Sequence, residues 1–115
     1  MKNFKKTPEF EKEFRRLLKK FRSLEQDLSD FEEVLQEYPT GIGSKFAIIH
    51  DEGKVKVVKA RLACRTLHNS SLRVIYAWHE KMVTFVYIEL YPKNEKENED
   101  RGRIKRYLKS TGKEI

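Results

Sequence analysis

The chain has 115 residues, with 25 Lys or Arg and 18 Asp or Glu, and a formal net charge of +7 at pH 7. This length predicts one domain, residues 1–115, around one core. No apolar run reaches the ~20 residues of a bilayer-spanning helix, and no apolar stretch typical of a signal peptide follows the first charged residues. The single Cys64 and the scattered histidines lack metal-ligand spacing. We therefore expect a cytoplasmic protein without a membrane segment, metal or cofactor.

Positive charge is concentrated in the second half of the chain. Residues 1–53 carry 10 basic and 11 acidic side chains, a net of −1, whereas residues 54–115 carry 15 and 7, a net of +8. Such a cationic half favours an anionic partner, either nucleic acid or an acidic protein segment. A basic surface that serves only solubility explains the charge equally well.

Two amphipathic helices are predicted first. Thr7-Pro8-Glu9 is typical of a helix start, and apolar residues then recur with helical spacing, which predicts a helix over Pro8–Phe21. A second helix is predicted over Leu24–Tyr38, with Ser23 and Gln26 in the spacing of a capping box. Because the joint between them is short, we expect an αα-hairpin whose apolar stripe packs on another layer.

The hydrophobic period changes to about two after residue 40, which indicates strands. A candidate edge strand lies at Asn3–Lys5, a two-residue hairpin turn is predicted at Glu80–Lys81, and the charged tail 94–113 predicts a weak terminal helix that begins near Gly102. The four predicted main strands are Phe46–His50, Lys54–Leu62, Leu72–His79 and Met82–Tyr91. The sequence thus predicts an α+β fold, with an N-terminal αα-hairpin on a mainly antiparallel sheet of four to five strands and a short C-terminal helix.

Alternation along these strands places three cations on one sheet face. Lys59 and Arg61 share a face of their strand, and Arg73 lies on the matching face of the next. The opposite face is predicted to form the core, with Leu72, Val74, Tyr76 and Trp78. Like charges so close favour an anion among them, such as a phosphodiester. The alternative is that each cation extends into solvent or pairs with a carboxylate such as Glu89.

Three segments, in their order behind a helical hairpin, resemble the RelE/ParE superfamily of bacterial toxin-antitoxin toxins. They are Lys59-Ala60-Arg61-Leu62, Leu72-Arg73-Val74-Ile75-Tyr76 and the stretch from Ile88 to Glu97. The resemblance covers nearly the whole chain, and its most specific pieces are the K-x-R strand, the R-V-I-Y strand and the Y-x-K-x-E-K-E segment.

For the RelE branch, the resemblance implies a microbial RNase-like fold that enters the ribosomal A site and cuts mRNA without a metal. Carried over by position, Lys59 is the general base or electrostatic activator, and Arg61 and Arg73 bind the scissile phosphate. Tyr91 and Lys93 then orient a base or assist the leaving group. Since lysine is a poor base at its ordinary pKa, we expect the two neighbouring arginines to lower the pKa of Lys59.

Four further residues are candidate RNA contacts: His68, Arg103, Arg106 and Tyr107. The implied partners are the ribosome with its mRNA and a cognate antitoxin, which forms an oligomer with the toxin. We expect the antitoxin to cover the open sheet face or to displace the weak terminal helix. For His50 and His79 we expect surface or turn roles, and for Cys64 the role of a small buried hydrophobe.

Two other functions are compatible with the same resemblance. One is a ParE-like inhibitor of DNA gyrase without nuclease activity, and the other is a non-catalytic relative that only binds RNA or protein. The cationic cluster favours the nuclease, because a gyrase inhibitor has no need of a site centred on a phosphate.

Overall fold

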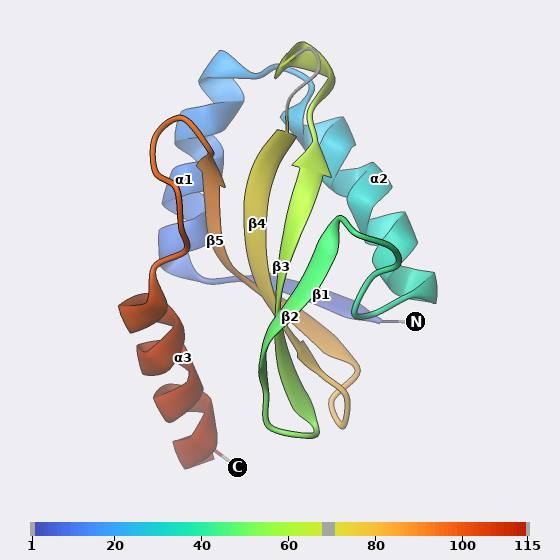
Figure 1. Cartoon of the computed structure of the whole chain (residues 1–115), viewed down its shortest axis with the longest axis vertical. Coiled ribbons are helices and arrows are strands. Elements are labelled where there is room, and N and C mark those ends of the chain that lie inside the picture. Colours follow the sequence, from blue (N-terminus) through green and yellow to red (C-terminus); the bar gives the residue numbers. More distant parts are fainter. Residues whose placement is uncertain (1, 68–70, 115) are drawn as a thin grey trace.

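A computed structural model describes residues 2–67 and 71–114 and has a five-stranded mixed sheet with three α-helices (Figure 1). The strands are β1 (Asn3–Lys6), β2 (Phe46–Asp51), β3 (Val55–Ala63), β4 (Ser71–His79) and β5 (Thr84–Pro92). The helices are α1 (Pro8–Lys20), α2 (Leu24–Glu37), the short 3-10 helix η1 (Arg65–Leu67) and α3 (Arg101–Glu114). The prediction of an α+β fold is confirmed.

The sheet has the order β1-β5-β4-β3-β2, so β1 and β2 are its edges. The β2–β3, β3–β4 and β4–β5 pairs are antiparallel, as predicted, whereas β1 pairs parallel with β5. The chain crosses from β1 through α1 and α2 to the far edge before it returns, and this crossover brings the N-terminal strand beside β5 in the parallel sense.

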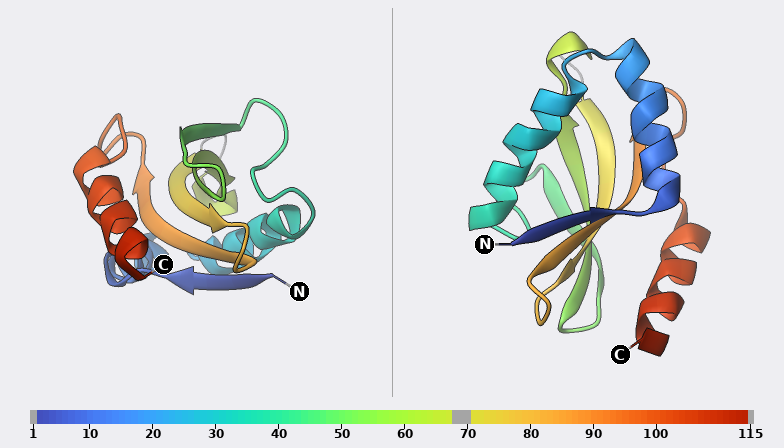
Figure 2. Two further views of the ribbon diagram at one scale, coloured as in Figure 1. Left: turned by 90° about the horizontal axis from the view of Figure 1, so that it is seen from below. Right: turned by 180° about the vertical axis from the view of Figure 1, so that it is seen from behind.

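The two N-terminal helices cover one face of the sheet as a splayed pair, which meets at residues 21–23 (Figure 2). α1 lies over β5 and α2 over β3. The core between these layers includes Phe10, Leu17, Leu24 and Leu35 from the helices and Val74, Tyr76 and Phe85 from the sheet, and all are fully or almost fully buried. The predicted core face is therefore confirmed, including Trp78, which is 8% exposed.

α3 packs on the opposite face of the sheet. Ile104 is buried there against Val57, Ile75 and Ile88, and Tyr107 and Leu108 pack at the margin of this second cluster. α3 begins at Arg101, one residue before the glycine at which the sequence predicted its start. None of the helices in the described residues is long and apolar enough to cross a membrane.

The helix starts are built differently from each other. Thr7 caps α1 as predicted, because its side-chain oxygen accepts a hydrogen bond from the backbone nitrogen of Phe10 at 3.2 Å. The predicted capping box at α2 is wrong. The Ser23 hydroxyl donates instead to the buried carboxylate of Asp27 at 2.7 Å and accepts from Thr66, so it ties the helix joint to η1.

The β4–β5 turn is wider than predicted. It spans residues 80–83, and β5 begins at Thr84, whereas Met82 and Val83 are exposed. A two-residue hairpin turn requires positive φ angles that Gly and Asn adopt easily and Glu80 and Lys81 do not. The chain instead places one residue, Val83, at a positive φ of 49°.

A β-bulge in β5 decides which side chains reach the α3 face. Ile75 of β4 pairs with Glu89, but the next residue, Tyr76, pairs with Tyr87, so Ile88 is the extra residue. The bulge changes the alternation, and Glu89 and Tyr91 come to lie on the face of Ile75 and Arg73. Without it, these two side chains would point toward the helical core.

Gly41 allows the connection between α2 and β2 to lie close against the core, because it has no side chain. Its φ is +83°, and a Cβ there would lie 1.9 Å from the ring of Phe46, which stacks on Phe31. We expect Gly41→Ala to lower the free energy of unfolding by about 2–3 kcal/mol, because both the backbone and the ring must shift. Gly43 has a similar φ of +80° but open space around it, so Gly43→Ala should cost only about 1 kcal/mol. Urea unfolding of both variants measures this difference, and equal losses would contradict the role assigned to Phe46.

Candidate anion-binding site

The predicted cations meet at one end of the α3 face. Arg61 and Arg73 are direct cross-strand partners, and Arg73 is in turn opposite Tyr91. Lys59 lies two residues from Arg61 on the same strand face. The side chains of Lys59, Arg61, Arg73 and Lys93 line one cavity of about 330 Å³. We call this cavity the cationic pocket.

The pocket contains a further cation that sequence reasoning missed. Lys45, in the linker before β2, lines it together with Glu97 of the β5–α3 linker. The backbone nitrogen of Arg61 donates to the Lys45 carbonyl at 3.0 Å, which fixes Lys45 beside β3. The sequence of this linker has no periodic pattern from which its position could be predicted. Lys45 reaches the other cations of the pocket because β2 pairs with β3.

Most of these cations form no ion pair with the described residues. Among the described residues, no carboxylate forms an ion pair with Lys45, Arg61, Arg73 or Lys93. The Arg73 guanidinium donates to the Ser71 hydroxyl at 2.8 Å, a neutral contact that leaves its charge uncompensated. Four uncompensated cations around one cavity favour a bound anion.

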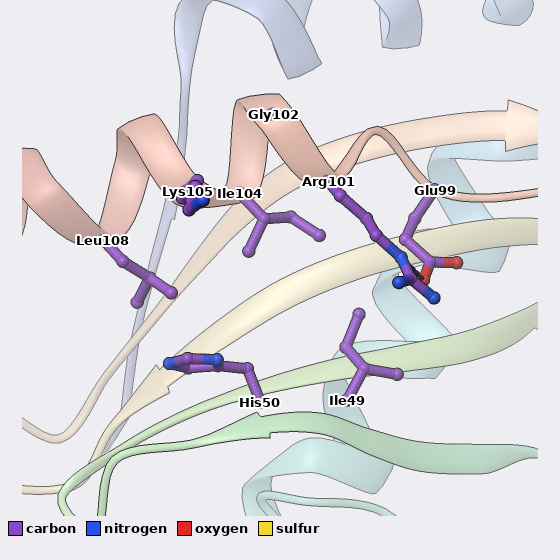
Figure 3. A pocket seen from close by; sticks show the side chains of 8 residues that line it. All are labelled: Ile49, His50, Glu99, Arg101, Gly102, Ile104, Lys105 and Leu108. Atoms are coloured by element: carbon purple, nitrogen blue, oxygen red, sulfur yellow. Dashed lines mark ion pairs between the residues drawn. The ribbon is translucent and has the colours of Figure 1, made fainter.

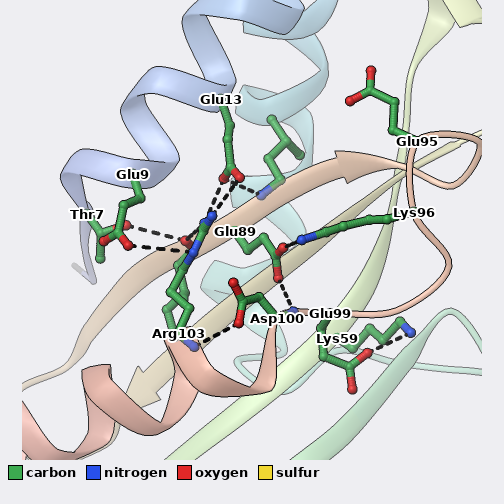
Figure 4. A network of polar contacts seen from close by, with 12 residues as sticks. Thr7, Glu9, Glu13, Lys59, Glu89, Glu95, Lys96, Glu99, Asp100 and Arg103 are labelled. Carbon is green, nitrogen blue, oxygen red and sulfur yellow. Dashed lines mark hydrogen bonds and ion pairs between the residues drawn. The ribbon is translucent and has the colours of Figure 1, made fainter.

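Lys59 is the exception. Its ammonium donates to the Glu99 carboxylate at 2.9 Å, and the two side chains are 25% and 8% exposed (Figure 4). This hydrogen bond raises the pKa of Lys59, against the smaller opposing effect of burial. The expected lowering of that pKa is therefore wrong, because the hydrogen bond with the Glu99 carboxylate has the largest effect. In this arrangement Lys59 acts as a fixed positive charge.

Tyr91 is next to the pocket, as the cross-strand partner of Arg73. Its side chain is 2% exposed, and the Lys96 ammonium lies 4.9 Å from the ring centroid. Burial raises the pKa of its hydroxyl, against the smaller opposing effect of the nearby Lys59 ammonium. The ring is thus covered and is not open to stack on a base.

The predicted RNA contacts on α3 lie elsewhere. Arg103, Arg106 and Tyr107 line a separate hollow of about 210 Å³ beside the start of α1. Arg103 is engaged in a bidentate pair with Glu13, with both N–O distances at 2.9 Å. His68 lies outside the described residues.

Arg103 and its neighbours close the backbone gap that the β5 bulge leaves (Figure 4). Arg103 donates to the carbonyl of Ile88 at 2.9 Å, and the backbone nitrogen of Leu90 donates to Glu13 at 3.1 Å. The completely buried Glu89, which the sequence offered as a partner for the cationic cluster, pairs instead with Lys96 and accepts from the backbone nitrogen of Asp100 at 2.8 Å. These contacts anchor the β5–α3 linker and fix Glu99 beside Lys59.

His79 is buried, contrary to the surface or turn role expected for it. It is 4% exposed under α3, and its Nε2 lies 2.6 Å from the Tyr107 hydroxyl. The sequence offered no sign of this, because the burial depends on where α3 docks.

Burial lowers the pKa of His79 below its ordinary value of 6.5. Below pH 6.5 the unfolded chain therefore takes up a proton that the folded protein resists, and we expect stability to fall as the pH drops from 6.5 to the folded pKa. In His79→Gln this part of the slope should disappear. Unfolding free energies measured between pH 7 and 5 give the comparison, with the half-exposed His50→Gln as control. An unchanged slope in His79→Gln would refute the prediction.

A larger hollow of about 650 Å³ lies between the edge strand β2 and α3 (Figure 3). Its walls are Ile49, His50, Glu99, Arg101, Gly102, Ile104, Lys105 and Leu108. Apolar side chains face one another across it, while Arg101 and Lys105 give its rim a positive charge. We call it the β2–α3 groove. Glu99 is shared between this groove and the cationic pocket, because it lines the former and binds Lys59 of the latter.

Comparison with known proteins places the fold. No family model and no curated protein sequence matches the chain. A chain in the crystal structure of the archaeal RelE–RelB complex from Pyrococcus horikoshii OT3 superposes with a TM-score of 0.63 at 19% identity, over 83% of this chain and 98% of that one. The chain therefore has a RelE-like fold.

Proposed function

We propose that this chain is the toxin of a toxin–antitoxin pair and cuts mRNA on the ribosome, in the cytoplasm, without a metal. The observation that carries the proposal is the cationic pocket on a RelE-like fold, because four of its cations have no ion-pair partner in the described part of the chain. A phosphodiester supplies the negative charge that such a pocket binds.

The reaction that suits the pocket is transfer of the phosphate to the ribose 2′-oxygen. The 2′-hydroxyl loses its proton and attacks phosphorus, the bond to the 5′-oxygen breaks, and that oxygen takes up a proton. The products are a 2′,3′-cyclic phosphate and a 5′-hydroxyl. Negative charge grows on the phosphoryl oxygens, and donors fixed around them stabilise the transition state.

The position of each cation in the pocket determines its proposed role in the reaction. Arg61 and Arg73 face each other across β3 and β4 and offer paired donors to the phosphate. Lys59 adds a positive charge, and in the free protein its hydrogen bond with Glu99 favours the protonated form. Lys45 and Lys93, at the exposed wall, bind the neighbouring phosphates of the strand. The pocket thus contributes charge stabilisation, and the 2′-hydroxyl proton passes to water or to a ribosomal group.

The proposed antitoxin has a candidate docking surface in the β2–α3 groove. The groove combines apolar walls with a cationic rim, which suits a segment with apolar anchors and acidic flanks. The anchoring of α3 by Glu13 and Arg103 favours a partner that fills the groove over one that displaces the helix. Copurification with the product of the adjacent gene tests this proposal, which fails if the two proteins do not associate at micromolar concentration.

The function is tested in a purified translation system. We expect mRNA cleavage only on translating ribosomes, with fragments that end in a 2′,3′-cyclic phosphate and a 5′-hydroxyl. Inhibition of gyrase supercoiling without mRNA cleavage would replace the proposal by the ParE-like function. Inactivity in both assays, with the folded protein bound to RNA, would identify a non-catalytic relative.

A further inference from the structure

Glu99 is the one carboxylate in the described chain that reaches a cation of the pocket wall at ion-pair distance. Its Oε1 lies 2.9 Å from the Lys59 ammonium, and only 8% of its side chain is exposed. Burial of a carboxylate is costly unless a cation and hydrogen bonds compensate it. The Glu99 carboxylate therefore stands where an incoming anion would meet Lys59.

A phosphate at Lys59 would lie next to this carboxylate. Lysine has three donor hydrogens, so geometry allows both anions on one ammonium, but their negative charges repel across a short distance. Binding of the phosphate is weakened for as long as Glu99 keeps its position. A carboxylate on the Lys59 ammonium is thus a competitor that the chain carries itself.

Glu99 also has a second cation within reach. Its other oxygen, Oε2, lies 3.7 Å from Nε of Arg101, whose side chain is 88% exposed at the rim of the β2–α3 groove. Figure 3 shows the Arg101 side chain extended toward Glu99. The backbone next to Glu99 is held by the hydrogen bond from Asp100 to Glu89. A side-chain rotation is therefore sufficient to move the carboxylate from Lys59 toward Arg101.

We propose that Glu99 is an internal competitor for the cationic pocket, which occupies Lys59 in the free protein and moves toward Arg101 when a phosphate binds. This inference rests on the proposed phosphate binding at the pocket. It adds a residue that sets the affinity of the site and that links the pocket to the groove in which the partner is proposed to bind.

The test measures binding of a 2′-O-methyl RNA hexamer, which cannot be cleaved because its 2′-oxygen is blocked. Fluorescence anisotropy at one fixed salt concentration compares the wild type with Glu99→Gln and with Glu97→Gln. The Glu97 carboxylate lines the same pocket and forms no ion pair within the described residues, so this control removes an equal charge without opening Lys59. We expect Glu99→Gln to bind about tenfold more tightly and Glu97→Gln no more than about twofold.

Three other results would contradict the inference. Equal gains in the two variants would overturn the inference, since charge alone would explain them. Weaker binding by a folded Glu99→Gln protein would overturn it too, because Glu99 would then position Lys59 for the phosphate. Wild-type protein gives a readout free of folding effects: added inorganic phosphate should shift the NMR resonance of the Glu99 side-chain carboxylate carbon as it leaves Lys59, and an unchanged resonance would contradict the competition.

Arg73→Ala separates this inference from the proposed function. If Arg73→Ala leaves hexamer affinity unchanged in both the wild type and Glu99→Gln, the phosphate does not bind in the pocket and the proposed function fails. If Arg73→Ala weakens binding in both proteins while Glu99→Gln binds no better than Glu97→Gln, phosphate binding in the pocket is supported and only the role of Glu99 is refuted.

Discussion

Arg73→Ala is expected to lower ribosome-dependent mRNA cleavage by about 30- to 1000-fold, which corresponds to roughly 2–4 kcal/mol of lost transition-state stabilisation. The guanidinium has no carboxylate partner in the described chain and lines the cationic pocket, so its charge is available to the phosphate. The interaction strengthens as negative charge grows on the phosphoryl oxygens. The loss should therefore appear in the rate of cleavage on saturated ribosomes.

The same variant should leave the fold intact. Arg61 and Arg73 oppose each other across β3 and β4, and removal of one like charge offsets the lost packing of the Arg73 side chain, so the free energy of unfolding should change by less than about 0.5 kcal/mol. Arg15→Ala is the matched control, since Arg15 is 79% exposed on α1 and outside the pocket. Full cleavage by a folded Arg73→Ala protein would remove Arg73 from the site, and a loss caused by unfolding would make its role structural.

Arg103→Ala should lower the free energy of unfolding by about 3 kcal/mol. It leaves the Glu13 carboxylate, which is 19% exposed, without its bidentate partner and removes the donor to the Ile88 carbonyl in the bulge. Glu13 would then keep only the Leu90 amide as a donor, and the Ile88 carbonyl only the Thr7 hydroxyl, so both groups would lose their strongest partner. Because these contacts join α3 to α1 and β5, amide hydrogen exchange should rise first in α3.

Arg106→Ala is the control for this prediction, because Arg106 is exposed on the same helix, and its loss should cost less than about 0.5 kcal/mol. The double variant Glu13→Gln, Arg103→Met removes both charges and should recover part of the stability. A loss below about 1 kcal/mol in Arg103→Ala would mean that the apolar contacts of Ile104 hold α3 without the ionic anchor.

The sequence was informative where the structure depends on local patterns. Strand alternation was sufficient to place Lys59, Arg61 and Arg73 on one face, because the β3–β4 pair keeps its register along its length. Helical spacing was sufficient to predict α1 and α2 with ends close to those observed. In each case, the signal comes from neighbours in the chain.

The remainder of the site depends on contacts between distant segments. The pairing of Lys59 with Glu99 joins residues forty positions apart, and it reverses the expected direction of the Lys59 pKa shift. The bulge at Ile88 leaves no local signal in a run of β-forming residues, yet it directs Glu89 and Tyr91 to the α3 face. α3 has few apolar residues, so its sequence indicated a weak helix, whereas ion pairs with α1 supply much of its attachment.

The parallel pairing of β1 with β5 has a consequence for the order of folding. Among the strands of this sheet, β1 is synthesised first and β5 last, and Asn3 is paired with Thr84. β1 therefore remains unpaired until β5 has been synthesised. Pairing between segments so distant in the sequence slows folding. The pocket has the same dependence, because its lining residues Lys93 and Glu97 follow β5. A partly synthesised chain thus lacks a complete pocket, so the proposed mRNA cleavage would require the finished β5 and the linker after it.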